Sequence, residues 1–423
     1  MRSMTMFGRQ IRFFCAALPL LLTTTGCGPG ADPCGPLSRV QEVLERIALH
    51  PFAGPRVLDL VDLVNDIIAD ECVAMNEIQI IGTHNSYHEI PRPVLLGAFV
   101  GLDPAALEWE YTNRPLDEQF EDQGIRQIEL DVFADPDGGL YSDRLALGLI
   151  GQEVASGEPA LDEPGFKVLH VQHADFETTC LTFVACLETV KAWSDAHPEH
   201  VPIMILIEAK DEAFFAPLIP VPVFIGTAEL RALEDEIRSV FPDDRIVTPD
   251  DVRGDHATLE EAILSDGWPR LGSVRGKVMF GLDNAGKHDL YVDGDPSLAG
   301  RLIFPDSTPG EPDAAFVKVN DPVSDPTRIA DLVAAGYIVR TRADSGLAQG
   351  RTGDTSRREI ALASGAQFVS TDFADPTEIV SIDASQPFDP SYEVSLPDDQ
   401  TARCNPIAAQ ATCRSYALER SSP

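Results

Sequence analysis

Residues 202–207 read PIMILI, an unbroken apolar run that leads directly into Glu208. A short run that is apolar at every position is typical of a strand in a parallel sheet that helices cover on both faces. Seven further short runs that contain several apolar residues occur elsewhere in the chain, at residues 78–82, 126–132, 167–171, 277–281, 316–319, 337–340 and 367–370. Amphipathic patterns between many of these runs predict helices over residues 181–196, 227–240, 258–264, 326–335 and 357–365. Strands alternating with helices in this way predict an α/β fold, a (β/α)8 TIM barrel.

The alternative with the same elements is an open doubly wound sheet, but the first run is not followed by a glycine-rich phosphate loop. We expect the barrel over residues 76–375. Residues 27–75 are expected to hold a tether and two N-terminal helices, over 37–49 and 56–68, and residues 376–423 a loop-rich tail that a disulfide clamps.

Residues 1–26 have the pattern of an export signal. Arginines at positions 2, 9 and 12 precede an apolar run from Phe13 to Leu22, which is too short to span a bilayer. The residues TTGC at 24–27 resemble a lipoprotein cleavage box, in which Cys27 would carry the lipid. Plain secretion after cleavage at a nearby small residue is the alternative. We therefore expect an exported protein, lipid-anchored at the cell envelope or secreted.

The cysteines beyond position 27 are even in number, which suggests disulfides in an oxidising compartment. They are Cys34, Cys72, Cys180, Cys186, Cys404 and Cys413. Close spacing favours Cys180–Cys186 and Cys404–Cys413, which leaves Cys34 with Cys72, although six cysteines allow fifteen pairings. A zinc site is less well supported, because the sequence has no CxxC pair with matched histidines.

The chain is strongly acidic. Its formal net charge is −36, and removal of the three arginines of the signal makes it −39. Such a field repels phosphate backbones, so we expect no nucleic-acid partner. A substrate that carries a phosphate would need a local cation, from a metal ion or an arginine, inside the site.

Polar residues lie at the ends of the first four predicted strands, where the active sites of TIM barrels are found. They are His84 and Asn85 after the first strand, Glu129 and Asp131 within the second, His170 at the end of the third with His173 beyond it, and Glu208 and Lys210 at the end of the fourth. Glu129 and Asp131 are two residues apart, so their side chains point to the same face of the strand. Buried carboxylates are costly unless they are paired or bind a metal ion. Together with Glu208 and the amide oxygen of Asn85, they predict a site for a hard cation.

Each of these signals has a structural alternative when it is taken alone. A histidine at a strand end is often a hydrogen-bonded structural residue, and Glu208 could form an ion pair with Lys210 or Arg126. The occurrence of all of them in order on four strands favours one functional site.

Several segments resemble the calcium-dependent phosphatidylinositol-specific phospholipase C family, and its secreted bacterial and fungal branch in particular. The segments are IQIIGTHNSY at 78–87, GIRQIELD at 124–131, KVLH at 167–170, VRTRAD at 339–344 and GAQFVSTD at 365–372. They cover nearly the whole predicted barrel. The combination of HNSY with ELD is fairly specific, whereas either motif alone is not.

The resemblance implies roles for the residues on the first, second and fourth strands. His84 matches the first catalytic histidine, which assists removal of the proton from the inositol 2-hydroxyl group. Four further residues match the calcium ligands, namely Asn85, Glu129, Asp131 and Glu208.

The second catalytic histidine of the family, which protonates the leaving diacylglycerol oxygen, matches His170 or His173. We favour His170 because it caps its predicted strand. Lys210 is a candidate for contact with phosphate. Arg340 and Arg342 are candidates for contact with phosphate or inositol hydroxyls, with structural ion pairs as the alternative.

The resemblance implies a phosphodiesterase that acts on phosphatidylinositol-type lipids through inositol 1,2-cyclic phosphate, with Ca²⁺ as cofactor. Its partners would be a phospholipid head group and, peripherally, a membrane, and we expect a monomer. One alternative is a glycerophosphodiester phosphodiesterase, although those enzymes typically carry His-Arg-Gly where this sequence has His84-Asn85-Ser86. The other is a non-catalytic lipoprotein that binds an inositol lipid.

Overall fold

The computed structural model describes residues 34–50, 54–214, 219–375, 379, 381–382 and 385–419. The predicted export signal and Cys27 lie outside the described residues. Within them, no helix combines the length and the apolar character that a membrane span requires.

The core of the protein is a ring of parallel strands. These strands are β1 (Ile78–Thr83), β2 (Gln127–Phe133), β4 (Ile203–Ala209), β6 (Val278–Leu282), β7 (Ile303–Pro305), β8 (Phe316–Lys318), β9 (Ile338–Arg342) and β10 (Phe368–Thr371). Neighbours pair in the order β8-β9-β10-β1-β2-β4-β6-β7. One parallel bridge, between Asp306 and Phe316, joins the end of β7 to the start of β8. The predicted TIM-barrel fold is confirmed.

Two of the strand predictions need correction. Residues 167–171 do not form the third barrel strand, because β2 pairs directly with β4 from Gln127 to Val132. Only β3 (Lys167–Val168) forms there, and it runs antiparallel to the last residues of β2. The missing barrel strand is β7, which the sequence analysis did not find because it is three residues long and ends in a proline.

The pairing between β1 and β2 is short, because these strands share one register pair, Gly82 with Gln127. A Cβ atom at Gly82 would lie 2.0 Å from the side-chain oxygen of Gln127, so glycine permits this close approach. Towards the start of β1, the short strand β11 (Ala402–Cys404) pairs antiparallel with residues 78–80. Ile80 pairs with β10 on one edge and β11 on the other, so β11 occupies the edge of β1 that faces β2. The C-terminal tail thus completes the sheet at this gap.

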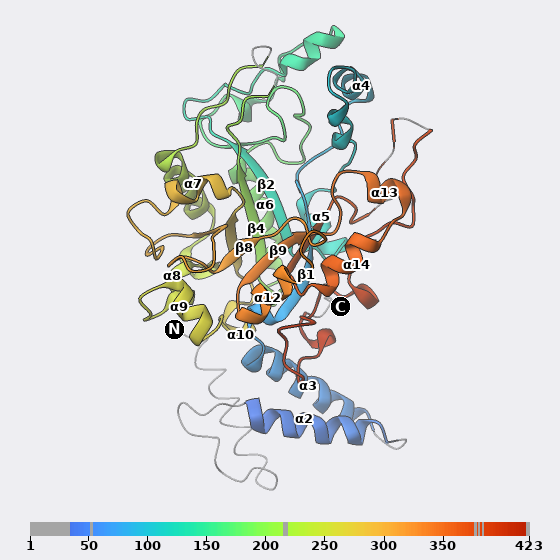
Figure 1. The fold of residues 1–423 in the computed structure, drawn as a ribbon, viewed down its shortest axis with the longest axis vertical. Helices are drawn as coiled ribbons and strands as arrows, with labels where there is room; N and C mark the ends of the chain where they lie inside the picture. The colour runs from blue at the N-terminus through green and yellow to red at the C-terminus, as the bar shows by residue number, and fades with distance from the viewer. Residues whose placement is uncertain are drawn as a thin grey trace.

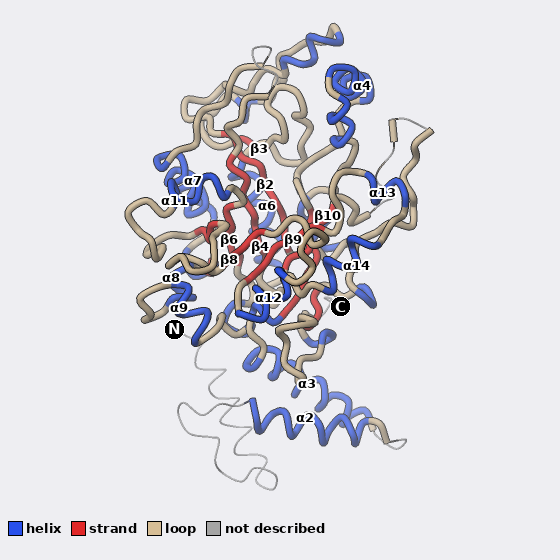
Figure 2. The backbone as a smooth tube through the Cα atoms, viewed as in Figure 1, coloured by secondary structure: helices blue, strands red, loops and turns tan. Residues whose placement is uncertain are grey.

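Helices surround the ring of strands (Figures 1 and 2). They are α5 (Leu116–Asp122), α6 (Phe183–Ala196), α7 (Thr227–Val240), α8 (Pro249–Arg253), α9 (Leu259–Ser265), α10 (Leu271–Val274), α11 (His288–Tyr291), α12 (Arg328–Ala335), α13 (Ala348–Thr352) and α14 (Ser356–Ala363). Helix α4 (Pro93–Leu102) lies beyond one end of the ring (Figure 1). Another short strand, β5 (Ile246–Val247), pairs with the start of β6. The five helices predicted between strands are present as α6, α7, α9, α12 and α14, with shifts of one or two residues at some ends.

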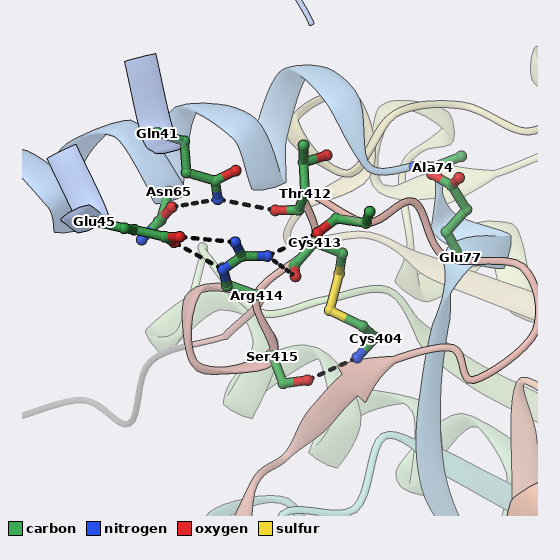
Figure 3. The surroundings of a disulfide bond; sticks show 11 residues. Gln41, Glu45, Asn65, Ala74, Glu77, Cys404, Thr412, Cys413, Arg414 and Ser415 are labelled. Carbon is green, nitrogen blue, oxygen red and sulfur yellow. Dashed lines mark hydrogen bonds and ion pairs between the residues drawn. A yellow bond between two sulfur atoms is a disulfide. The ribbon is translucent and has the colours of Figure 1, made fainter. Parts of the chain in front are cut away.

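The N-terminal helices and the C-terminal tail pack together at one end of the barrel, opposite α4 (Figure 1). Helix α2 (Cys34–Ala48) begins inside the expected tether, and α3 (Pro55–Cys72) follows it. Figure 3 shows the junction with the tail: Arg414 forms an ion pair with Glu45 at 2.8 Å, and Gln41 donates to the carbonyl of Thr412 at 3.0 Å. All three disulfides favoured by sequence spacing are present, namely Cys34–Cys72, Cys180–Cys186 and Cys404–Cys413.

Candidate active site

Three carboxylates project into the barrel from two neighbouring strands. Asp131 on β2 is the register partner of Glu208 on β4, and Glu129 lies two residues before Asp131 on the same face. Glu129 is 2% exposed and Asp131 is fully buried. Oxygen atoms of the three side chains lie within 4.8 Å of one another. The structure therefore brings the predicted carboxylates into one cluster.

Two cations partly neutralise this cluster. Lys210 Nζ lies 3.3 Å from an oxygen of Asp131 and 3.4 Å from one of Glu208. Burial disfavours the ammonium group, but these two carboxylates outweigh burial and raise the pKa of Lys210. Arg340 on β9 is also buried, and its Nη2 donates to Glu129 at 2.5 Å. With the three carboxylates, Lys210 and Arg340 all ionised, the cluster keeps one net negative charge.

The donor atoms of this cluster fit a hard cation such as Ca²⁺. The Oδ1 of Asp131 and the Oδ1 of Asn85 are buried and have no hydrogen-bond donor among the residues that the structure describes, and the Oδ2 of Asp131 has the ion pair with Lys210 at 3.3 Å. Asn85 has a positive φ of 42°, a conformation that asparagine tolerates better than most residues. Its Nδ2 donates to the Tyr111 hydroxyl at 2.7 Å, which holds the amide in one orientation. Carboxylate and amide oxygens are the protein ligands of calcium, and an oxygen without a donor is available to bind a cation.

His84 follows β1 directly and lies beside the carboxylate cluster. Its Nδ1 donates to Asp372 at 2.7 Å, and Asp372 also accepts from Arg342 at 2.7 Å. Its Nε2 lies 3.7 Å from Glu129 Oε1 and 3.2 Å from Arg342 Nη1. Burial and the charge of Arg342 lower the pKa of His84 to about 3. His84 is therefore neutral near pH 7, with a proton on Nδ1 and a lone pair on Nε2.

The second histidine candidates have different surroundings. His170, in the loop after β3, donates from Nδ1 to Asp175 at 2.6 Å. Burial lowers its pKa, and Asp175 opposes that shift. His173 donates from Nδ1 to the carbonyl of Asp143 at 2.6 Å. His84 and His170 both line one cavity of about 410 Å³, whereas the described residues that line this cavity do not include His173. The geometry favours His170 over His173 as the partner of His84.

The sequence analysis missed three side chains that orient the histidines. Asp372 follows the last residue of β10, so the rule that places active sites at strand ends could have identified it. Asp175 and His88 lie in loops. Their spacing in the sequence does not indicate that Asp175 contacts His170 or that His88 contacts Asp175. Arg342, predicted to bind substrate, lines the cavity while it pairs with Asp372.

We expect calcium affinity to weaken as the pH falls. Burial outweighs Arg340 and raises the pKa of Glu129 from 4.5 to about 7. Below this pH a proton occupies the carboxylate and competes with the cation, so affinity should fall by about tenfold per unit of pH for each such proton. Calorimetric titration with Ca²⁺ at pH 8 and pH 6 measures this effect.

The matched control is Glu129→Gln, which should bind Ca²⁺ more weakly at pH 8 and show a smaller change between the two pH values. Equal affinity of the unsubstituted protein at pH 8 and pH 6 would contradict the assignment of Glu129 as a ligand.

Comparisons with known proteins identify the family of this chain. The chain is similar to a Ca²⁺-dependent phosphatidylinositol-specific phospholipase C from Streptomyces antibioticus, with 18% identity, a TM-score of 0.44, and coverage of 73% of this chain and 98% of that one. It is similar to a calcium-dependent phosphoinositol-specific phospholipase C from Pseudomonas sp., with 17% identity, a TM-score of 0.44, and coverage of 76% and 96%. Curated protein sequences give no match. The family model for Ca²⁺-dependent phosphoinositide phospholipase C matches residues 73–406, and the chain belongs to this family of phosphodiesterases.

Proposed function

We propose that this enzyme cleaves phosphatidylinositol-type lipids into diacylglycerol and inositol 1,2-cyclic phosphate. The observation that carries the proposal is the arrangement of His84 and His170 on one cavity, with the carboxylate cluster next to His84. Attack of an alcohol on a phosphodiester needs a base, an acid for the leaving oxygen, and positive charge near the nonbridging oxygens. The site offers a group for each of these tasks.

His84 is suited to act as the base. Its Nδ1–H is held by Asp372, and its Nε2 lies beside Glu129 and accepts from Arg342 Nη1 at 3.2 Å, so the lone pair of Nε2 would exchange the contact with Arg342 for the proton of the inositol 2-hydroxyl. The hydroxyl oxygen then forms a bond to phosphorus. The imidazolium that results lies beside the negative charge of Asp372, whose pKa is about 2 because Arg342 and His84 outweigh its burial. Asp372 would thus stabilise the charge that His84 acquires.

His170 is suited to act as the acid. Its Nδ1 is held by Asp175, so Nε2 is left to donate a proton to the glycerol oxygen as the bond from that oxygen to phosphorus breaks. The lowered pKa of His170 disfavours the protonated form in the free protein. A bound phosphodiester places a negative charge beside the ring, which favours protonation.

Asn85, Glu129, Asp131 and Glu208 would hold Ca²⁺, which when bound supplies a Lewis acid that lowers the pKa of the 2-hydroxyl group. Lys210 and Arg342 then provide the chain's own positive charge for the phosphate oxygens. Lys210 has contacts to two of the proposed ligands, so its ammonium group lies next to the cation site.

Exposed apolar side chains near the cavity support contact with a lipid surface. Val94 and Leu102 on α4 are 69% and 61% exposed, and Val221 and Phe224 are 64% and 65% exposed. The lining of the cavity includes Asp103, Ala105 and Ala106, which follow α4, and Ala213 and Phe214, which precede Val221 and Phe224 in the chain. Insertion of such side chains into the outer part of a bilayer would bring the lipid phosphate to the site. Export, with or without a lipid on Cys27, remains part of this proposal.

The proposal is tested by comparing substrates under matched conditions. With phosphatidylinositol we expect release of diacylglycerol that stops in excess chelator and is restored better by Ca²⁺ than by Mg²⁺. Release of glycerol phosphate from glycerophosphoinositol would instead support a glycerophosphodiester phosphodiesterase. Tight binding of inositol phosphate with no turnover would support the non-catalytic alternative.

A further inference from the structure

A third histidine, His88, is fully buried behind the site and takes no part in the proton transfers described above. Its Nε2 lies 3.0 Å from one oxygen of Asp175 and 3.2 Å from the other. Its Nδ1 lies 3.1 Å from the carbonyl oxygen of Tyr111, and its ring stacks on that of Tyr111 at 4.3 Å. The ring is thus fixed by contacts at both nitrogens and on one face.

The direction of these hydrogen bonds follows from the partners. The carbonyl oxygen of Tyr111 and the carboxylate of Asp175 both accept, so in this arrangement both nitrogens of His88 carry a hydrogen, Nδ1 towards Tyr111 and Nε2 towards Asp175. Asp175 is fully buried, and the described structure gives its carboxylate two side-chain partners, His88 and His170. His88 spans both oxygens of Asp175, whereas His170 contacts Oδ2 alone at 2.6 Å. His88 therefore sets the plane of the carboxylate, and the carboxylate sets the orientation of His170.

We propose that His88 is a positioning residue for the acid: it holds Asp175 so that His170 keeps its Nδ1–H on the carboxylate and presents Nε2 to the cavity. This inference rests on the proposed function. The ring of His88 meets that of His170 edge to face at 5.3 Å, so the two histidines pack against each other as well as share the carboxylate. Movement of an acid by about 1 Å from its productive place can cost about 100-fold in rate.

Two substitutions at this position form a matched pair. In His88→Gln the amide nitrogen can occupy the place of Nε2 and still donate to Asp175. In His88→Asn the amide nitrogen can occupy the place of Nδ1, so the contact with Tyr111 is kept and the contact with Asp175 is lost. Both variants are uncharged and lose the positive charge of a His88 that donates from both nitrogens, so they differ from each other mainly in the contact with Asp175.

The readout is the dependence of each variant on the leaving group. We expect His88→Asn to lower kcat for phosphatidylinositol by about 10- to 100-fold, and to lower it less than about threefold for a nitrophenyl ester of inositol phosphate. Nitrophenolate leaves without a proton, so its release does not need His170. His88→Gln should retain most of the activity on both substrates. If His88→Asn fails to fold, His88→Phe, which keeps the stacking on Tyr111, carries the same comparison.

Equal losses on the two substrates, or no loss on either, would overturn the role of His88. A loss in His88→Gln as large as that in His88→Asn would also overturn it. Absence of turnover of both substrates by the unsubstituted protein would instead overturn the proposed function, so the two failures are distinguishable. A nitrogen-15 spectrum of the histidines adds a readout without substrate: His170 should be protonated on Nδ1 in the unsubstituted protein and show a mixture of tautomers in His88→Asn.

Discussion

Replacement of His84 by alanine is expected to lower turnover of phosphatidylinositol by about two to four orders of magnitude, the usual contribution of a positioned base. The side chain is placed by the end of β1, by a 2.7 Å hydrogen bond to Asp372, and by Arg342 next to its Nε2. Its low pKa keeps it unprotonated at neutral pH, which is the form a base needs. Steady-state kinetics on lipid in mixed micelles with saturating Ca²⁺ measures the loss.

The control for this experiment is His256→Ala, because His256 lies in the surface loop between α8 and α9 and forms an ion pair with Asp266. We expect this variant to keep the activity of the unsubstituted protein. Asp372→Asn should lower the rate in the same direction as His84→Ala, and the double variant should lose little more than His84→Ala alone, because the two residues act as a unit. Activity of His84→Ala within a few-fold of the unsubstituted protein would exclude His84 as the base.

Replacement of Glu419 by alanine is expected to destabilise the protein by about 3–5 kcal/mol, the usual cost of removing one partner from a buried ion pair. Glu419 belongs to the C-terminal tail and accepts from Arg126 Nε at 2.9 Å. It also accepts from the backbone N–H of Val201 at 2.7 Å. Arg126 is buried, and its guanidinium carbon lies 4.4 Å from the centre of the Trp193 ring. Without Glu419, the Nε and Nη2 of Arg126 and the N–H of Val201 lose this acceptor, whereas the Nη1 of Arg126 keeps two backbone carbonyls.

Chemical denaturation of the oxidised protein measures this loss as a shift in the midpoint. Glu359→Ala is the matched control: its partner is Arg358, its side chain is 61% exposed, and a surface pair of this kind contributes about 0–1 kcal/mol. A midpoint for Glu419→Ala that equals that of Glu359→Ala would show that the tail does not stabilise the barrel through this pair.

Much of the barrel could be predicted because several of its strands are apolar on both faces, and that pattern is visible over five or more residues, as in β4 and β6. The pattern fails where a strand is very short. Residues 303–305 form a barrel strand with three residues. Val168, Leu169 and Val171 are apolar because they are buried where β3 pairs with the end of β2 and in the loop that follows. The place of β11 beside β1 depends on a pairing between residues more than 300 positions apart, and no local pattern predicts it.

The site could be predicted to the extent that its groups lie on or directly after strands. Glu129, Asp131 and Glu208 converge because β2 and β4 are neighbours in register. The predicted order placed a strand at residues 167–171 between them, so the common rim was predicted but the direct pairing was not. The orientation of the histidines could not be predicted in the same way. His170 is oriented by Asp175, which lies in the same loop, and Asp175 is held by His88 from the loop after β1, so the arrangement exists only when both loops are folded.

The most direct measurement of the central claim is phosphorus NMR of the products from phosphatidylinositol, recorded with Ca²⁺ and again with excess chelator. The account predicts that the lipid phosphodiester signal is replaced by the signal of a five-membered cyclic phosphodiester when Ca²⁺ is present, and that the lipid signal persists in chelator. A cyclic product that forms equally well in chelator would contradict the cation site, and a phosphomonoester on the glycerol product would contradict the proposed cleavage.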